Sequence, residues 1–335
     1  MKRFSLLAII LITFINSQAF TVQPKESLID TIKSQPKEKC WKLFGTTNLN
    51  FNQISFSNWA LGGEDALSGT AGFNLNAFYK NKSLTFENSA ILIYGMIESR
   101  DKGLMKMEDR LEFNSKLNYQ AIKYWNYSLL LSYKSQFAPG FVYPNRTNAV
   151  SRFMAPGYMI LSLGMDYVPT KHFSLFMSPV SGKFTFVLDQ KLADAGAYGV
   201  RGVLKDTLGN IISHGEPLKP ELGMTVNAKL RYEVMKNIIV DSRIVLYDAY
   251  MDENINNRWN VDVDFETTIN FVINSVFSTT FNSRFLYDNN IMVPLFDKVE
   301  GTKVQIGVGP RLQIKEAFGI GMVMKLGGKK KPKTN

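Results

Sequence analysis

The sequence has a single cysteine, Cys40, and only two histidines, His172 and His214. One cysteine excludes an internal disulfide, and it excludes a zinc or iron–sulfur site that needs several cysteines. Two histidines leave little room for a histidine-rich metal site. We therefore expect no metal and no cofactor.

A strongly charged body is also missing. The formal net charge is +10, but Lys2 and Arg3 stand at the start of the chain and four lysines follow Gly328. The part between them is only weakly positive, which does not favour a nucleic-acid partner. We expect residues 327–335 to form a solvated basic tail, with contact to a polyanion such as anionic lipid as the alternative.

Long hydrophobic runs are lacking too, since no stretch reaches the roughly 18 apolar residues of a transmembrane helix. The longest apolar run, Phe4 to Ile15, follows two basic residues and precedes Ser17-Gln18-Ala19, a small-x-small cleavage pattern. We expect residues 1–19 to be a cleaved signal peptide, a retained anchor being the alternative. Residues 20–44 are then a periplasmic segment of an exported protein.

The chain instead alternates between apolar and polar residues with a period of two. Residues 110–119, 222–233 and 260–271 are clear examples. These segments are longer than typical strands of soluble proteins, and they have the length of a tilted strand that crosses a bilayer. In the first, the apolar face carries Leu111, Phe113, Leu117 and Tyr119.

Short and long connections alternate between these segments. Short turns near 121–123 and 235–237 contrast with long loops such as 136–157 and 180–220. Aromatic residues also gather near the segment ends, as at a membrane interface. We predict an all-β, transmembrane antiparallel β-barrel over residues 45–326, with a long loop at 181–220; a soluble β-sandwich or β-solenoid is the alternative.

The number of strands is less well determined by the pattern. Thirteen alternating segments can be counted, including 303–314 and 317–326, but a barrel with both ends in the periplasm needs an even number. Residues 183–189 also alternate and would make fourteen. The first segment, 45–57, is the alternative: its apolar parity slips between Phe51 and Ile54, as at a bulge, so it need not pair as a full strand. We predict about fourteen strands, with twelve as the alternative.

Several stretches together resemble a known family. They are Phe56 to Glu64, Gln136 to Gly140 with Tyr143-Pro144-Asn145, Phe153 to Pro156, Leu161 to Tyr167, and Phe173 to Val200. They are similar to uncharacterised outer-membrane β-barrel proteins of the Bacteroidota, which form a domain-of-unknown-function family. The resemblance implies an outer-membrane barrel and no assigned activity.

The sequence contains only weak signals for a catalytic site. A barrel hydrolase needs a nucleophile or carboxylate placed beside a histidine. His172 adjoins a short turn, and His214 lies in the long loop beside Ser213, although triad members are usually distant in sequence. We predict that the protein is not an enzyme.

The inward polar faces carry charges of both signs. The acidic ladder on 262–266 is predicted to lie between strands that carry Arg243 and Arg284, and Lys134 is a further inward candidate. One interpretation is a wet pore that orients polar solutes; the other is a packed, salt-bridged interior. The predicted pore-lining residues are Arg110, Glu112, Lys116, Arg231, Arg243, Asp262, Asp264, Glu266 and Arg284.

The long loop at 181–220 is the second candidate site. It contains a predicted hairpin at 205–210 and a predicted short helix at 191–197. It either folds over the barrel mouth or contacts a ligand or partner. The predicted contact residues are Lys191, Asp194, Asp206 and His214.

Together these features predict an outer-membrane pore or transporter for small polar solutes. The alternative is a non-conducting barrel that serves as a structural or binding anchor through its long loops. The expected partners are outer-membrane lipid, the barrel-insertion machinery and a small polar solute.

Overall fold

The computed structural model describes residues 41–54, 66–99, 102–251, 258, 260–299 and 302–326. The predicted signal peptide, most of the predicted periplasmic segment and the basic tail lie outside these residues. The expectations about those three segments therefore stay predictions.

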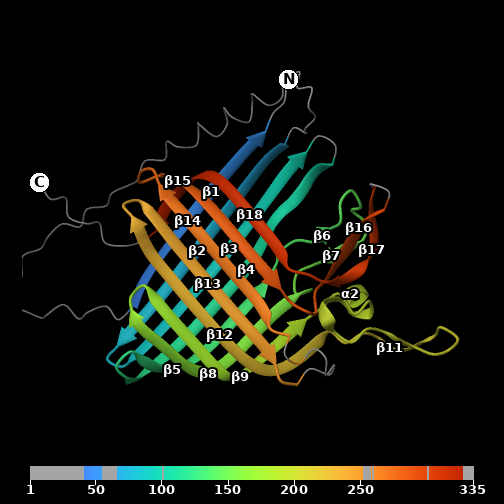
Figure 1. Ribbon diagram of the computed structural model, residues 1–335, viewed down its shortest axis with the longest axis horizontal. Coiled ribbons are helices and arrows are strands. Elements are labelled where there is room, and N and C mark those ends of the chain that lie inside the picture. Colours follow the sequence, from blue (N-terminus) through green and yellow to red (C-terminus); the bar gives the residue numbers. More distant parts are fainter. Residues whose placement is uncertain are drawn as a thin grey trace, which may run out of the picture. The chain divides into compact units, whose positions relative to one another are not determined.

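Twelve strands of the described part of the chain close into one antiparallel barrel (Figure 1). Pairing of the first strand with the last completes the closure. The prediction of an all-β antiparallel barrel is confirmed, with twelve strands, the lower of the two predicted numbers. The barrel strands are β1 (Trp41–Ile54), β2 (Ala66–Asn81), β3 (Leu84–Ser99), β4 (Gly103–Ile122), β5 (Trp125–Ser135), β8 (Gly157–Thr170), β9 (Phe173–Phe186), β12 (Leu218–Met235), β13 (Ile238–Ala249), β14 (Asp262–Val272), β15 (Phe277–Tyr287) and β18 (Gln313–Leu326).

Two predicted strands are not separate members of the barrel. The segment 303–314 falls mostly in β17 (Thr302–Pro310), which pairs with β16 (Met292–Val299) in a hairpin outside the barrel. The segment 183–189 is not an extra strand, because β9 continues through Phe186 in register with both β8 and β12. Alternation marks a two-sided strand but does not reveal which strand it pairs with.

The two ends of the barrel differ in their connections. At one end, called the turn end, neighbouring strands are joined by short turns, and Lys82, Tyr124 and Asn237 adopt positive φ there. The barrel begins and finishes at this end, since Gly45 pairs with Leu326. The opposite end, called the loop end, carries the long connections.

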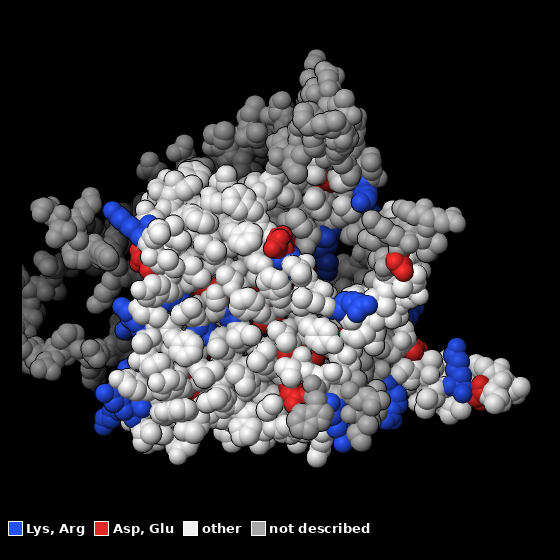
Figure 2. All heavy atoms as spheres, viewed as in Figure 1, with Lys and Arg blue, Asp and Glu red and all other residues white. Residues whose placement is uncertain are grey.

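The outer wall of the barrel is apolar. On β4, Phe113 and Tyr119 are 39% and 57% exposed, whereas the neighbouring inward side chain of Glu112 is 1% exposed. Figure 2 shows a wall that is largely uncharged on the face in view, with most charged side chains toward its ends. Exposed apolar area of this extent is unfavourable in water and favourable in lipid.

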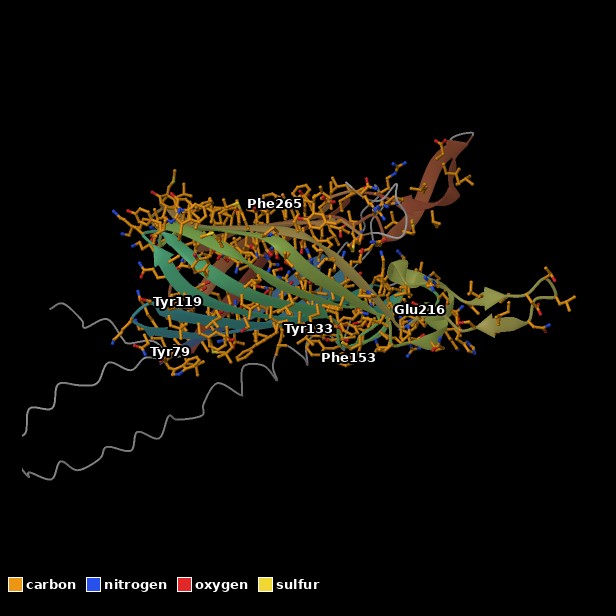
Figure 3. All side chains as sticks on the ribbon, turned by 90° about the horizontal axis from the view of Figure 1, so that it is seen from below. Tyr79, Tyr119, Tyr133, Phe153, Glu216 and Phe265 are labelled. Atoms are coloured by element: carbon orange, nitrogen blue, oxygen red, sulfur yellow. The ribbon has the colours of Figure 1, made fainter. Side chains whose placement is uncertain are left out.

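Aromatic side chains contact one another at the turn end. Trp41 packs against Tyr79 with ring centroids 5.1 Å apart, and Trp125 packs against Tyr167 at 4.8 Å. Figure 3 places Tyr79 and Tyr119 at this end of the barrel. Such rings suit a membrane–water interface, where one end of the side chain is apolar and the other is polar. None of the helices in the described ranges is long and apolar enough to span a membrane.

Small elements cover and extend the loop end. The β9–β12 connection spans 187–217 and packs against the β5–β8 connection through Ala155, Val187, Ala193 and Val200. The two hairpins β10–β11 and β16–β17 project beyond the loop end (Figures 1 and 3). The remaining elements are β6 (Gly140–Phe141), β7 (Ala149–Ser151), α2 (Gln190–Asp194), η1 (Ala197–Gly199), β10 (Leu204–Lys205) and β11 (Ile211–Ser213).

Candidate functional site

Charged side chains from two opposite walls of the barrel meet inside it. The β4–β5 wall supplies two cations and one carboxylate, and the β13–β15 wall supplies two of each. We call this set the central ion cluster, and each of its members is mostly buried. Its members are Arg110, Glu112, Lys134, Arg243, Asp264, Glu266 and Arg284.

Three ion pairs of the central ion cluster span the lumen. Arg110 Nη1 lies 2.8 Å from Glu266 Oε1, and five strands separate β4 from β14 in either direction around the barrel. Arg243 Nη1 lies 3.3 Å from Glu112 Oε2. Lys134 Nζ lies 2.5 Å from Asp264 Oδ2. Opposite walls are therefore joined by charge-assisted hydrogen bonds.

The same groups also pair within each wall. On β4, Arg110 Nε lies 3.3 Å from Glu112 Oε1. Arg243 Nη2 lies 3.4 Å from Glu266 Oε2 on the neighbouring strand. Arg284 holds Asp264 with two donors, Nε at 2.9 Å and Nη2 at 3.0 Å. Every carboxylate of the cluster thus has a cation on each side.

Burial makes this pairing necessary. The Glu112 side chain is 1% exposed, and those of Glu266 and Arg243 are 13% and 15% exposed. A buried charge costs several kcal/mol unless an opposite charge and hydrogen bonds compensate it. The ion pairs therefore hold the two opposite walls together at this level of the interior.

A pocket of about 160 Å³ adjoins the cluster. Arg110, Lys134 and Arg284 of the cluster line one part of it, and Gln136 and Tyr158 another. Glu108, also in the lining, forms a further ion pair with Lys315 of β18. The lining of the pocket combines charges of both signs with apolar surface, which suits a small molecule with polar groups.

Two further lysines form ion pairs inside the barrel outside the cluster. Lys183 of β9 contacts Asp262 at 2.5 Å and Asp288 at 3.2 Å, and its side chain is 6% exposed. Lys116 contacts Asp166 of β8 at 2.6 Å. The acidic ladder is therefore divided, because Asp262 pairs with Lys183 rather than with the cations of the cluster.

The structure places the nine predicted pore-lining residues in different surroundings. Six belong to the central ion cluster, and Lys116 and Asp262 form the separate pairs just described. Arg231 lies toward the turn end, 70% exposed, with Asp241 of the adjacent strand 3.3 Å away. Whether these residues line a conducting path stays a prediction.

Sequence reasoning missed several of the paired charges, among them Lys183, Asp166 and Asp288. Lys183 and Asp166 occupy inward positions of alternating strands, so the alternation could have identified them. Asp288 directly follows β15, where the alternation ends, and no sequence signal marked it.

The loop residues predicted to contact a partner hold the loop itself together. Asp194 accepts hydrogen bonds from Gly215 N at 2.7 Å and Gln190 Nε2 at 2.8 Å, and His214 Nδ1 lies 3.1 Å away. The Gly215 N–H is the main cause that lowers the pKa of Asp194 below its ordinary value. Lys191 is exposed on α2. A contact with a partner stays a prediction for all of them.

Asp206 has a similar internal role in the β10–β11 hairpin. Its carboxylate accepts hydrogen bonds from the backbone N–H of Leu208 and of Asn210. The Asn210 side chain also donates to it, and this bond is the main cause that lowers the pKa of Asp206. The carboxylate therefore organises the turn of the hairpin.

The two histidine rings make different contacts, and the ring of His214 lies beside the Asp194 carboxylate described above. Ser213 Oγ donates to the carbonyl oxygen of His214 at 3.1 Å rather than to its ring. His172 Nδ1 lies 3.0 Å from the carbonyl oxygen of Arg231 at the turn end. In the part of the chain that the structure describes, no group of three or more His, Cys, Asp or Glu residues could hold a metal ion.

Comparison with solved structures finds several membrane barrels. An outer membrane channel from Pseudomonas putida F1 matches with a TM-score of 0.39 and 12% identity, over 85% of this chain and 95% of that one. The translocator domain of the autotransporter NalP from Neisseria meningitidis matches with a TM-score of 0.36 and 9% identity, over 86% and 89% of the two chains. At these values the similarity says nothing of what this chain carries or binds. None of the curated proteins matches the sequence.

A family model gives one further match. Residues 51–141 match a family described as a protein of unknown function (DUF3078). This range contains two of the stretches on which the sequence resemblance rests, Phe56 to Glu64 and Gln136 to Gly140, but not the block Phe173 to Val200. Over residues 51–141, the chain is therefore similar to a domain of unknown function.

Proposed function

We propose that this protein is an outer-membrane channel for small polar solutes. The observation that carries the proposal is a closed barrel with an apolar outer wall and an interior lined by charges. An apolar exterior is unfavourable for a barrel in water, and a charged interior is unfavourable for the passage of apolar solutes.

The barrel size agrees with this role. An eight-stranded barrel has an interior that side chains can fill, whereas sixteen or more strands leave a wide aqueous channel. Twelve strands lie between these cases, so long charged side chains can reach across the lumen and still rearrange. A path for small solutes then depends on the position of the central ion cluster.

Single-channel recording tests this proposal. The refolded protein is inserted into planar bilayers, with a heat-dependent shift in gel mobility as the control for folding. We expect discrete current steps that grow with salt concentration. A folded protein that gives no steps at any voltage or salt concentration would contradict a channel.

A second candidate function is a non-conducting anchor. It is favoured by the two hairpins that project from the loop end with exposed apolar side chains, among them Leu208 at 85% and Ile306 at 62%. Exposed apolar patches commonly mark binding surfaces. A silent but folded barrel in the recordings would favour this function.

The wider setting belongs to the same proposal. We expect export through a cleavable signal peptide, insertion by the barrel-insertion machinery, and contact of the outer wall with outer-membrane lipid. We expect neither enzymatic activity nor nucleic-acid binding. An origin in the Bacteroidota stays a prediction from sequence resemblance.

A further inference from the structure

We propose that the central ion cluster is a two-state gate, which opens when its ion pairs across the lumen are exchanged for ion pairs within each wall. The inference rests on the proposed channel function and names how that channel is regulated. The inference follows from the ion-pair partners of the cluster, because most of its charges have one partner across the lumen and one within their own wall.

Four members of the cluster form a ring of alternating contacts. Arg110 contacts Glu266 across the lumen and Glu112 on its own strand. Arg243 contacts Glu112 across the lumen and Glu266 on the neighbouring strand. Opening breaks the two contacts that span the lumen, and the two contacts within the walls remain. Each arginine and each glutamate then keeps one opposite charge.

The third pair across the lumen, Lys134 with Asp264, can also be broken without leaving either charge unpaired. If Lys134 leaves Asp264, the carboxylate keeps its two hydrogen bonds from Arg284. Lys134 in turn lies directly opposite Glu112 in the β4–β5 register. Facing residues of adjacent strands are close enough to form an ion pair. The released lysine therefore has a carboxylate within its own wall.

Charge is nearly balanced on each wall alone. The β4–β5 wall carries Arg110, Lys134 and Glu112, and the β13–β15 wall carries two arginines and two carboxylates. Breaking a buried ion pair usually costs several kcal/mol, because it leaves a buried charge without an opposite charge beside it. Here Arg110 and Lys134 share Glu112 in the open state, so every charge still has an opposite charge beside it. A small bias from salt, voltage or solute can then shift the equilibrium.

Substitution of Lys134 tests the gate in one direction. Lys134→Gln removes one contact across the lumen while Asp264 keeps Arg284. We expect the ratio of open to closed time in single-channel recordings to rise about tenfold, the effect of losing one charged hydrogen bond. Lys80→Gln makes the same change at an exposed lysine of β2 near the turn end, and we expect it to leave the ratio unchanged.

A charge exchange tests the gate in the other direction. Arg110→Glu alone places two carboxylates face to face across the lumen, so we expect a more open channel. Adding Glu266→Arg restores an opposite pair across the lumen but creates like-charge pairs within both walls. The double variant should therefore be closed more than the wild type, with an open-to-closed ratio about tenfold lower.

The outcomes separate the gate from the channel. If the wild type conducts and Lys134→Gln leaves its open-to-closed ratio unchanged, the gate is wrong and the channel stands. The gate is equally wrong if the double exchange is as open as Arg110→Glu alone. If wild type and variants all fold by the gel-shift control and none conducts, the channel itself is wrong. Because the two tests use different residues, failure of one variant to fold leaves the other decisive.

Discussion

At the scale of single residues, the charges inside the barrel are satisfied by partners that are remote in sequence. Arg110 and Glu266 are 156 positions apart, and Lys183 and Asp262 are 79 positions apart. Alternation predicted that these side chains point inward. It could not predict their partners, because pairing across the lumen depends on closure and on the register of every strand between them.

The pair Lys116–Asp166 gives a stability prediction. Lys116→Met leaves the Asp166 carboxylate, 0% exposed, without its cation. We expect the free energy of unfolding in lipid vesicles to fall by about 3 kcal/mol, measured from urea midpoints by gel shift. The double change Lys116→Met with Asp166→Leu should recover most of the loss. A double variant as unstable as the single one would mean that the pair is not what stabilises this site.

The acidic ladder gives a selectivity prediction. Exchanging Asp262 and Asp264 for Asn, and Glu266 for Gln, removes three negative charges from the interior. Arg110 then keeps Glu112 and Lys183 keeps Asp288, so that the interior becomes more positive. We expect the open channel to shift its preference toward anions, read as a change in reversal potential under a salt gradient. An unchanged reversal potential would remove these three residues from the path of the ions.

At the scale of elements, the alternating pattern located most strands and assigned their faces correctly. It was wrong about 303–314, because the β16–β17 hairpin alternates as a barrel strand does. The pattern also predicted a separate strand at 183–189, where β9 continues through Phe186. Both errors concern which strand pairs with which, a long-range property that local periodicity does not contain.

Strands β8 and β9 approach closely at a bulge beside Gly164. A Cβ at this position would lie 2.1 Å from the carbonyl oxygen of Met177. We expect Gly164→Ala to lower the free energy of unfolding by about 1–3 kcal/mol. Gly69→Ala is the control, since its Cβ would meet only ordinary contacts with Phe51 at 3.5 Å. Equal stability of the two variants would argue against the close approach.

The 187–217 connection should loosen in acid. The pKa of Asp194 is lowered from its ordinary value of 3.8 by the Gly215 N–H. A carboxyl with a lowered folded pKa stabilises the fold above its unfolded pKa, and this contribution is lost as the pH falls through the folded pKa. We expect hydrogen exchange at the Gly215 amide to lose protection below pH 3.8. In Asp194→Asn, protection that falls just as steeply with pH would contradict this role.

At the scale of the whole molecule, the chain combines an apolar exterior, a charged interior and a network that joins opposite walls. The class of fold followed from the alternation and from the asymmetry of the connections. The pairing of the interior charges did not, because the sequence left open both a wet pore and a packed interior. In the structure these charges are paired with each other, both across the interior and within each wall.

Passage of small polar solutes through the barrel is tested most directly by liposome swelling. Vesicles that contain the refolded protein are placed in isotonic solutions of uncharged sugars of increasing size. We predict swelling faster than in protein-free vesicles for a pentose, and a decrease in rate toward a trisaccharide. The gel shift first shows that the protein in the vesicles is folded. If these vesicles then swell no faster than protein-free vesicles in any of the sugars, the result would contradict a channel for such solutes.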